Sequence, residues 1–244
     1  MLIRMSMILL SSLAILSCND GDGGTPPDEG STPGVTPILS PDSSDSTREA
    51  KVLQDATALE PLLDGFWTEE LQSVYGYQFD PPDRFEYYSR DGNKPCGNST
   101  FAGKENAYYC SADADEYVAF DLEWFKGYLV DFPQGATTFL ILAHEWGHAV
   151  QDTWLENGGP DTWEPASRQE LNADCLAGVF LSWGISSGNI IEDAGDADAI
   201  WSWLYSGGYN GPWLDPPSHG TGEERRTAFS DGYLRGTDHC RVNY

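Results

Sequence analysis

Hydrophobic and polar positions recur along the chain with two periods, and the longer period dominates. Apolar side chains return every three to four positions in several segments, which is the spacing of one helix face. The segment 48–67 has this spacing, and Pro61 predicts that its helix bends or ends there, because proline removes a backbone donor. A short helix over residues 68–77 should follow and be terminated by Pro81-Pro82. Four further helices are predicted over residues 135–155, 165–183 (with Pro165 in the first turn), 191–205 and 222–233.

Two segments between these helices alternate with a period of two, which is typical of strands. They are NAYYC (106–110) and DEYVAFDL (115–122), and the polar stretch SADA joins them. Adjacent strands with a short polar connection predict an antiparallel hairpin. The predicted fold class is therefore α+β and predominantly helical, with a small antiparallel sheet.

The N-terminal residues have the pattern of an export signal. Residues 1–17 carry one early charge, Arg4, followed by an apolar run that is short for a membrane span. The run ends in Ile15-Leu16-Ser17-Cys18, which resembles the lipobox of bacterial lipoproteins, in which the cysteine becomes the lipidated first residue. We therefore expect a signal peptide over 1–18 and export to the cell envelope with a lipid anchor at Cys18. The alternative is an ordinary signal peptide and plain secretion.

The next segment, residues 19–47, consists mainly of Gly, Pro, Ser, Thr and acidic residues, with no Lys or Arg. Such a segment cannot bury enough apolar surface to offset its chain entropy, so a disordered linker is predicted. Residues 48–244 remain for one folded domain.

The charge of the chain excludes one class of partner. The formal net charge is −26 at pH 7, whereas nucleic-acid binding requires a basic surface. We expect no nucleic-acid partner, and no docking of the folded domain on anionic lipid.

Five cysteines are present, and four remain once Cys18 is assigned to the anchor. In an exported chain an even number favours disulfides. Cys96 with Cys110 and Cys175 with Cys240 is the favoured pairing among the three that are possible.

The stretch ILAHEWGHAVQ (141–151) contains the strongest chemical signal. His144 and His148 are four residues apart, so on a helix both side chains reach one cation, while Glu145 lies one step round the helix. Two buried, hydrogen-bonded core histidines are the alternative. Histidine is scarce in this chain, however, and the flanking residues are apolar, so these imidazoles need partners.

A zinc site of this type requires a third ligand. Gln151 and Trp154 stand where metzincins have glycine and histidine, which excludes that subclass. Glu170 supplies a carboxylate on the next predicted helix, and Asp174, four residues on, would hold one imidazole N–H. A capping box between Ser167 and Glu170 is the competing interpretation.

HEWGHAVQ, RQELNADCLAGVF and SHGTGEERRTAF, in this order, resemble the bacterial putative neutral zinc metallopeptidase family, whose catalytic layout is of the gluzincin type. The segment from Cys96 to Phe125 is also similar to that family, and the resemblance spans about residues 95–240. It implies a zincin-like fold, one zinc ion and a protease role.

The implied mechanism is attack of a metal-activated water on a peptide bond, with Glu145 as general base. His219 is the first candidate for stabilising the oxyanion, because the resembling family has a histidine at this position. The weaker candidates are Tyr205, Tyr209 and Tyr233.

Other candidates receive structural interpretations. Arg225 and Arg226 are expected to pair with Glu223 and Glu224 on a solvated face rather than to bind a substrate carboxylate. By analogy with zincins, strand 116–121 is the edge along which a substrate would align. Three residues are expected outside the catalytic site, namely Trp201 and Trp203 in the core and His239 on the surface.

The leading hypothesis is a zinc endopeptidase that is exported and lipid-anchored and acts on proteins or peptides. The alternatives are a non-catalytic zinc-binding envelope lipoprotein that binds a partner or acts as a scaffold, and a purely structural zinc site.

Overall fold

The computed structural model describes residues 39–40, 42–89, 96, 106–112, 116–131, 135–159, 166–208 and 219–244. The predicted signal peptide with Cys18, most of the predicted linker, and both Pro165 and Tyr209 lie outside these residues. The elements within them are α1 (Asp45–Tyr75), β1 (Arg84–Tyr88), β2 (Ala107–Cys110), β3 (Tyr117–Asp121), α2 (Leu122–Asp131), α3 (Ala136–Glu156), α4 (Ala166–Ser187), α5 (Asp196–Ser206), α6 (Gly222–Arg235) and α7 (Thr237–Asn243).

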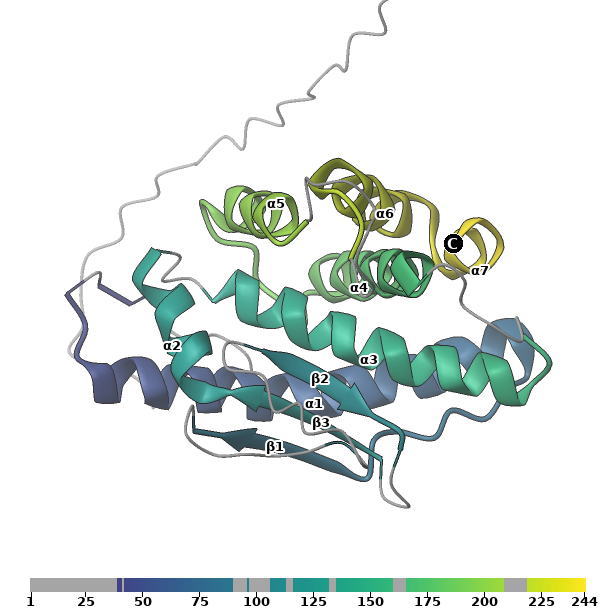
Figure 1. The fold of residues 1–244 in the computed structure, drawn as a ribbon, viewed down its shortest axis with the longest axis horizontal. Coiled ribbons are helices and arrows are strands. Elements are labelled where there is room, and N and C mark those ends of the chain that lie inside the picture. The colour runs from purple at the N-terminus through teal and green to yellow at the C-terminus, as the bar shows by residue number, and fades with distance from the viewer. Residues whose placement is uncertain are drawn as a thin grey trace, which may run out of the picture. The chain divides into compact units, whose positions relative to one another are not determined.

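Helix α3 lies at the centre of the domain. Figure 1 shows it between α1, α2 and the sheet on one side and α4–α7 on the other. Nearly all of its side chains are buried, and it contacts α1, α2, α4, α5 and β2. A helix that is apolar around its whole circumference requires such surroundings. The predominantly helical α+β class predicted from the sequence is confirmed.

The first helix is longer than the sequence predicted. Residues 45–75 form one helix through Pro61, so the predicted break is wrong, and the helix starts inside the segment assigned to the linker. Pro61 lies on the exposed face, while Leu59 and Leu63 on either side of it are fully buried. Their burial outweighs the hydrogen bond that proline removes. The helix ends at Gly76, which has a φ of 71°, and not at Pro81-Pro82.

The sheet has the order β1-β3-β2. β2 and β3 form the predicted antiparallel pair, with Tyr109 opposite Val118. β1 adds to the far side of β3 in parallel, so the sheet is mixed. The expectation that strand 116–121 is an edge is therefore wrong: β3 is the central strand, and β2 is the edge strand that contacts α3.

Two helices were not predicted and one begins later than predicted. α2 follows β3 directly, where the strand pattern had been extended through Leu122, and α7 follows the short interruption at Gly236. α5 begins at Asp196, because residues 191–195 are not helical. Within the described residues, no helix is both long and apolar enough to cross a membrane.

The backbones of α4, which carries Glu170, and α6 lie almost in contact at two glycines. A Cβ atom at Gly178 would lie 2.1 Å from the carbonyl oxygen of Phe229, and one at Gly232 would lie 1.8 Å from that of Cys175. Cys175 and Cys240, one of the two favoured pairs, form a disulfide that joins α4 to α7. Cys96 and Cys110, the other favoured pair, join the residues before β2 to its end.

The close approach of α4 and α6 makes Gly178→Ala and Gly232→Ala strongly destabilising. Each methyl group would overlap a backbone carbonyl, which moves only if a helix moves, so we expect a loss of about 1–3 kcal/mol or more in the free energy of unfolding. Urea denaturation followed by circular dichroism measures it. Gly65→Ala is the matched control. Gly65 is an exposed residue of α1, and a Cβ atom there would have no other atom within 4 Å. The variant should gain about 0.5–1 kcal/mol in the free energy of unfolding from helix propensity. Equal effects at all three positions would contradict the packing described here.

Candidate metal centre

Two histidines of α3 and one glutamate of α4 meet in the interior. His144 and His148 are one turn apart, so both side chains leave the helix on the face toward α4. The Oε2 atom of Glu170 lies 3.2 Å from Nε2 of His144 and 3.8 Å from Nε2 of His148. The competing capping box does not form, because α4 begins at Ala166 and Ser167 already lies within the helix.

A glycine between the two histidines allows α4 to approach. A Cβ atom at Gly147 would lie 3.0 Å from Cα and 3.3 Å from Cβ of Ala173. A methyl group here would require α3 or α4 to shift by a few tenths of an ångström, and a larger side chain would require more. The glycine inside the HEWGH motif therefore favours the close approach that brings Glu170 to the imidazoles, which helical spacing alone does not predict.

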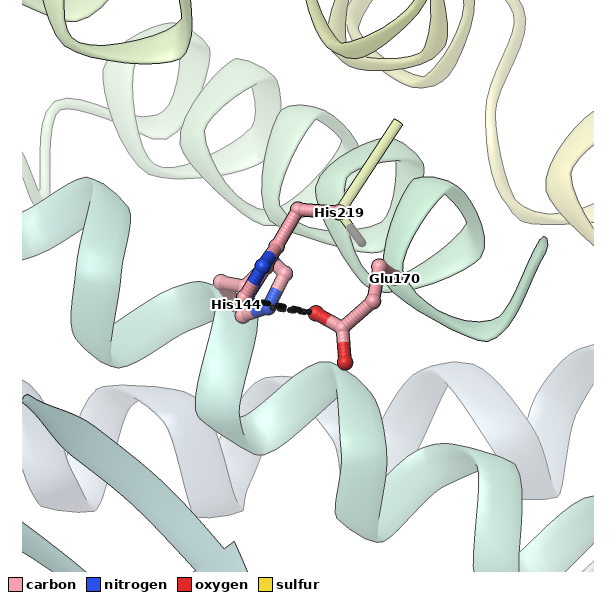
Figure 2. A group of neighbouring side chains, drawn as sticks. All are labelled: His144, Glu170 and His219. Atoms are coloured by element: carbon pink, nitrogen blue, oxygen red, sulfur yellow. Dashed lines mark hydrogen bonds and ion pairs between the residues drawn. The ribbon is translucent and has the colours of Figure 1, made fainter. Parts of the chain in front are cut away.

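His219 joins this group from the segment just before α6. Its Nε2 atom lies 3.1 Å from Oε2 of Glu170, although 47% of its side chain is exposed. Figure 2 shows His144, Glu170 and His219 pointing toward one another from three different parts of the chain. One ligand atom from each of these three residues lies within 4.8 Å of the other two.

The spacing of these atoms matches the requirement of zinc. In a tetrahedral site with bonds of about 2.0–2.1 Å, neighbouring ligand atoms are about 3.3 Å apart. The three imidazole nitrogens lie 3.1, 3.2 and 3.8 Å from the same carboxylate oxygen. Imidazole nitrogen and carboxylate oxygen are also ligands that zinc accepts. The residues therefore fit one zinc ion.

Asp174 and Arg225 support His144 from behind. Oδ1 of Asp174 lies 2.9 Å from Nδ1 of His144, as the sequence spacing had suggested. Arg225 donates from Nε and Nη2 to the two oxygens of Asp174, at 2.7 and 2.8 Å. The expectation that Arg225 pairs on a solvated face is wrong: the residue is 1% exposed, and its neighbour Glu224 instead forms a capping box with Thr221.

The buried charges shift the pKa values of the group. Burial alone would raise the pKa of Asp174, but the Arg225 guanidinium outweighs it and holds that pKa below its usual range. Burial lowers the pKa of His144, yet the hydrogen bonds to Asp174 and Glu170 prevail and raise it to about 10. In the metal-free protein His144 is therefore protonated at neutral pH, and a metal ion must displace that proton.

Glu145 faces the sheet rather than α4. Its Oε2 accepts a hydrogen bond of 2.9 Å from the backbone N–H of Tyr109 in the edge strand β2. Burial raises the pKa of this carboxyl. The Glu145 carboxylate is thus held by the sheet and does not belong to the group formed by His144, Glu170 and His219. No local sequence pattern predicted Tyr109 as its partner.

A pocket of about 290 Å³ opens beside these residues. Aromatic side chains form part of its wall, and Nε1 of Trp203 donates to the hydroxyl of Tyr128 at 2.9 Å. The expectation that Trp201 lies in the core is wrong, because it is 41% exposed. Trp203 is partly buried and packs against the hydrophobic core, and it also lines this pocket. The lining includes Ala107, Trp124, Tyr128, Ile141, His144, Glu145, Trp203, His219 and Arg225.

Several other candidates lie away from the group. The Arg226 guanidinium lies over the ring of Tyr205, 4.3 Å from its centroid, with its Nη1 3.6 Å from Glu223. The Tyr233 ring packs against Phe229. His239 lies near Asp231, with 19% of its side chain exposed.

A comparison with known protein families covers the residues of this site. The family model of the putative neutral zinc metallopeptidases matches residues 40–241, which include every residue of the group and all elements except the last two residues of α7. The chain belongs to this family. No curated protein and no solved structure matches the chain significantly. This family implies zinc and a protein or peptide substrate.

Proposed function

We propose that the protein hydrolyses peptide bonds with one zinc ion held by His144, His148 and Glu170. The observation that carries this proposal is the convergence of three imidazole nitrogens on one oxygen of Glu170. Residues from α3, α4 and the segment before α6 present ligand atoms to one carboxylate oxygen, and a bound zinc ion would join them in place of the hydrogen bond and ion pairs that they form without metal. The family supports zinc and a peptide substrate.

Zinc, when bound, would supply a Lewis acid that polarises a substrate carbonyl and lowers the pKa of a water to about 7. Glu145 would accept a proton from the attacking water and deliver it to the leaving amine. Its buried carboxyl suits this role, because a raised pKa brings a carboxylate closer to the range of an effective base. The Tyr109 N–H keeps the carboxylate in place without neutralising it.

The edge strand and the pocket suggest how a substrate would lie. Among the described residues β2 is an edge strand, and its Tyr109 N–H is already bonded to Glu145. An extended peptide could align along the rest of this edge. Ala107 on β2 lines the pocket together with Trp124 and Trp203. A substrate side chain next to the cleaved bond would enter between these aromatic walls.

His219 has two possible positions in this scheme. Its exposed side chain and its place in a connecting segment allow it to turn toward a substrate oxygen and donate a hydrogen bond to the developing negative charge. In the structure its Nε2 groups with the ligand atoms of His144 and Glu170, where it would itself bind the metal. A further protein ligand would take the position that a catalytic site leaves open for water, and this favours the second candidate function, a non-catalytic zinc protein.

Glu145→Gln separates the two functions. We expect the variant to retain zinc and the fold but to lose peptide hydrolysis by about 100- to 10,000-fold, because the amide cannot accept the proton. Glu170→Ala is the companion variant and should lose zinc itself. Metal content by atomic absorption and cleavage of a broad peptide library measure both effects. Turnover by Glu145→Gln equal to that of the wild type rules out the assigned base, and a zinc-loaded wild type without any hydrolysis supports the non-catalytic alternative.

We also propose that the protein is exported and held at a membrane of the cell envelope by a lipid on Cys18. The support is in the sequence alone: an apolar N-terminal run ending in a lipobox-like stretch, followed by an acidic linker.

Cys18→Ala tests this anchor. Without a thiol to carry the lipid, the protein should move from the membrane fraction to the soluble fraction or remain unprocessed. Fractionation followed by mass spectrometry of the N-terminus detects either result. Unmodified wild-type Cys18 in the membrane fraction would contradict lipidation, whereas the zinc chemistry would be unaffected.

A further inference from the structure

A chain of buried hydrogen bonds runs from His148 to the C-terminal disulfide. Nδ1 of His148 lies 2.9 Å from Oε1 of Gln151. Nε2 of Gln151 donates to Oδ1 of Asn172 at 2.9 Å, and Nδ2 of Asn172 donates to the carbonyl oxygen of Cys240 at 3.0 Å. Gln151 and Asn172 are both 0% exposed, so water does not compete for these bonds.

The acceptors along this series of hydrogen bonds fix which atom donates in each. The carbonyl of Cys240 can only accept, so Asn172 must present its NH₂ group there and its oxygen to Gln151. Gln151 also donates to the carbonyl of Gln169 at 2.8 Å, which uses the second hydrogen of its NH₂ group. The oxygen of Gln151 therefore faces His148, and an oxygen that only accepts requires a proton on Nδ1 of His148. The other nitrogen, Nε2, faces Glu170 at 3.8 Å.

The Nδ1 atom of the neighbouring histidine is held by a different group. Nδ1 of His144 contacts Asp174, a carboxylate that Arg225 neutralises. For His148 a neutral amide has this position. It orients the ring without adding a further negative charge to a region that already contains buried Glu145, Glu170 and Asp174.

We propose that Gln151 and Asn172 are positioning residues of the metal centre: they hold His148 with Nδ1 protonated and Nε2 directed at the metal, and the Cys175–Cys240 disulfide anchors this arrangement through α7. The inference rests on the proposed zinc site, since it assigns residues that act through one of its ligands. The helices agree with it. Gln151 follows His148 by one turn on α3, and Asn172 follows Glu170 by two residues on α4, so the amide pair links the two helices that carry the ligands.

The test is the zinc dissociation constant of the purified full-length protein, measured by competition with a chelator. Gln151→Met keeps the side-chain length but removes both polar atoms, and we expect it to weaken zinc binding by about 10- to 100-fold, the usual effect of losing a partner of a metal-bound histidine. Thr153→Ala is the control. Thr153 is also a buried polar residue of α3, two positions further on, but within the described part of the chain its hydroxyl bonds to the backbone of Ala149 and not to the metal group. Its zinc affinity should stay within about twofold of the wild type.

A double-mutant cycle separates positioning from general structural damage. If Gln151 acts through His148, the effect of Gln151→Met should fall below about twofold when His148→Ala is already present. An equal loss in both backgrounds would show that Gln151 stabilises the fold and does not position His148, which overturns the inference.

A second measurement does not depend on a variant that folds. In long-range ¹H–¹⁵N spectra of the zinc-loaded wild type, the inference requires a proton on Nδ1 of His148 that exchanges slowly with solvent. A deprotonated Nδ1 would overturn it. Failure of the wild type to take up zinc would overturn the proposed function and this inference together. Normal zinc uptake with unchanged affinity in Gln151→Met would overturn the inference alone.

Discussion

The chemistry of this protein depends on how closely two helices pack. At Gly147 the backbone of α3 comes so near to Ala173 on α4 that even a methyl group would require the neighbouring atoms to shift by a few tenths of an ångström. That contact lies between the two histidines along α3 and just beyond Glu170 along α4. It brings a carboxylate of one helix within ligand distance of the imidazoles of the other. On its other side α4 is held by its glycine contacts with α6 and by a disulfide to α7, so its position does not depend on the metal alone.

A second constraint is electrostatic. Glu145, Glu170 and Asp174 lie within one poorly solvated region, where unpaired carboxylates are costly. Arg225 compensates Asp174 directly. In the metal-free protein the proton on His144 compensates part of the remaining negative charge. A divalent cation would replace that proton and add one more positive charge. This explains how three carboxylates can be buried together next to the pocket.

Local periodicity predicted much of this arrangement, and its failures have a common cause. His144, His148, Glu170 and Asp174 were identified because helical spacing places them on single faces. Arg225 was misassigned because adjacent glutamates offered it local partners, whereas its true partner is 51 residues away. The central position of β3 depends on its parallel pairing with β1, which the alternation of residues does not encode. Pro61 was assumed to break a helix because the sequence does not show which face is exposed. The roles of the amides of Gln151 and Asn172 were overlooked because both residues stand within the matched motifs but have no metal-ligand or acid–base chemistry of their own, and their partners become visible only when α3 and α4 are packed together.

The central claim is that His144, His148 and Glu170 bind one zinc ion. Anomalous diffraction from crystals of the zinc-loaded protein, recorded on both sides of the zinc absorption edge, tests it most directly. The account predicts one strong anomalous peak about 2.0–2.2 Å from Nε2 of both histidines and from the carboxylate of Glu170, lost in crystals of Glu170→Ala. A peak elsewhere in the molecule, or no peak at this group in zinc-saturated crystals, would contradict it.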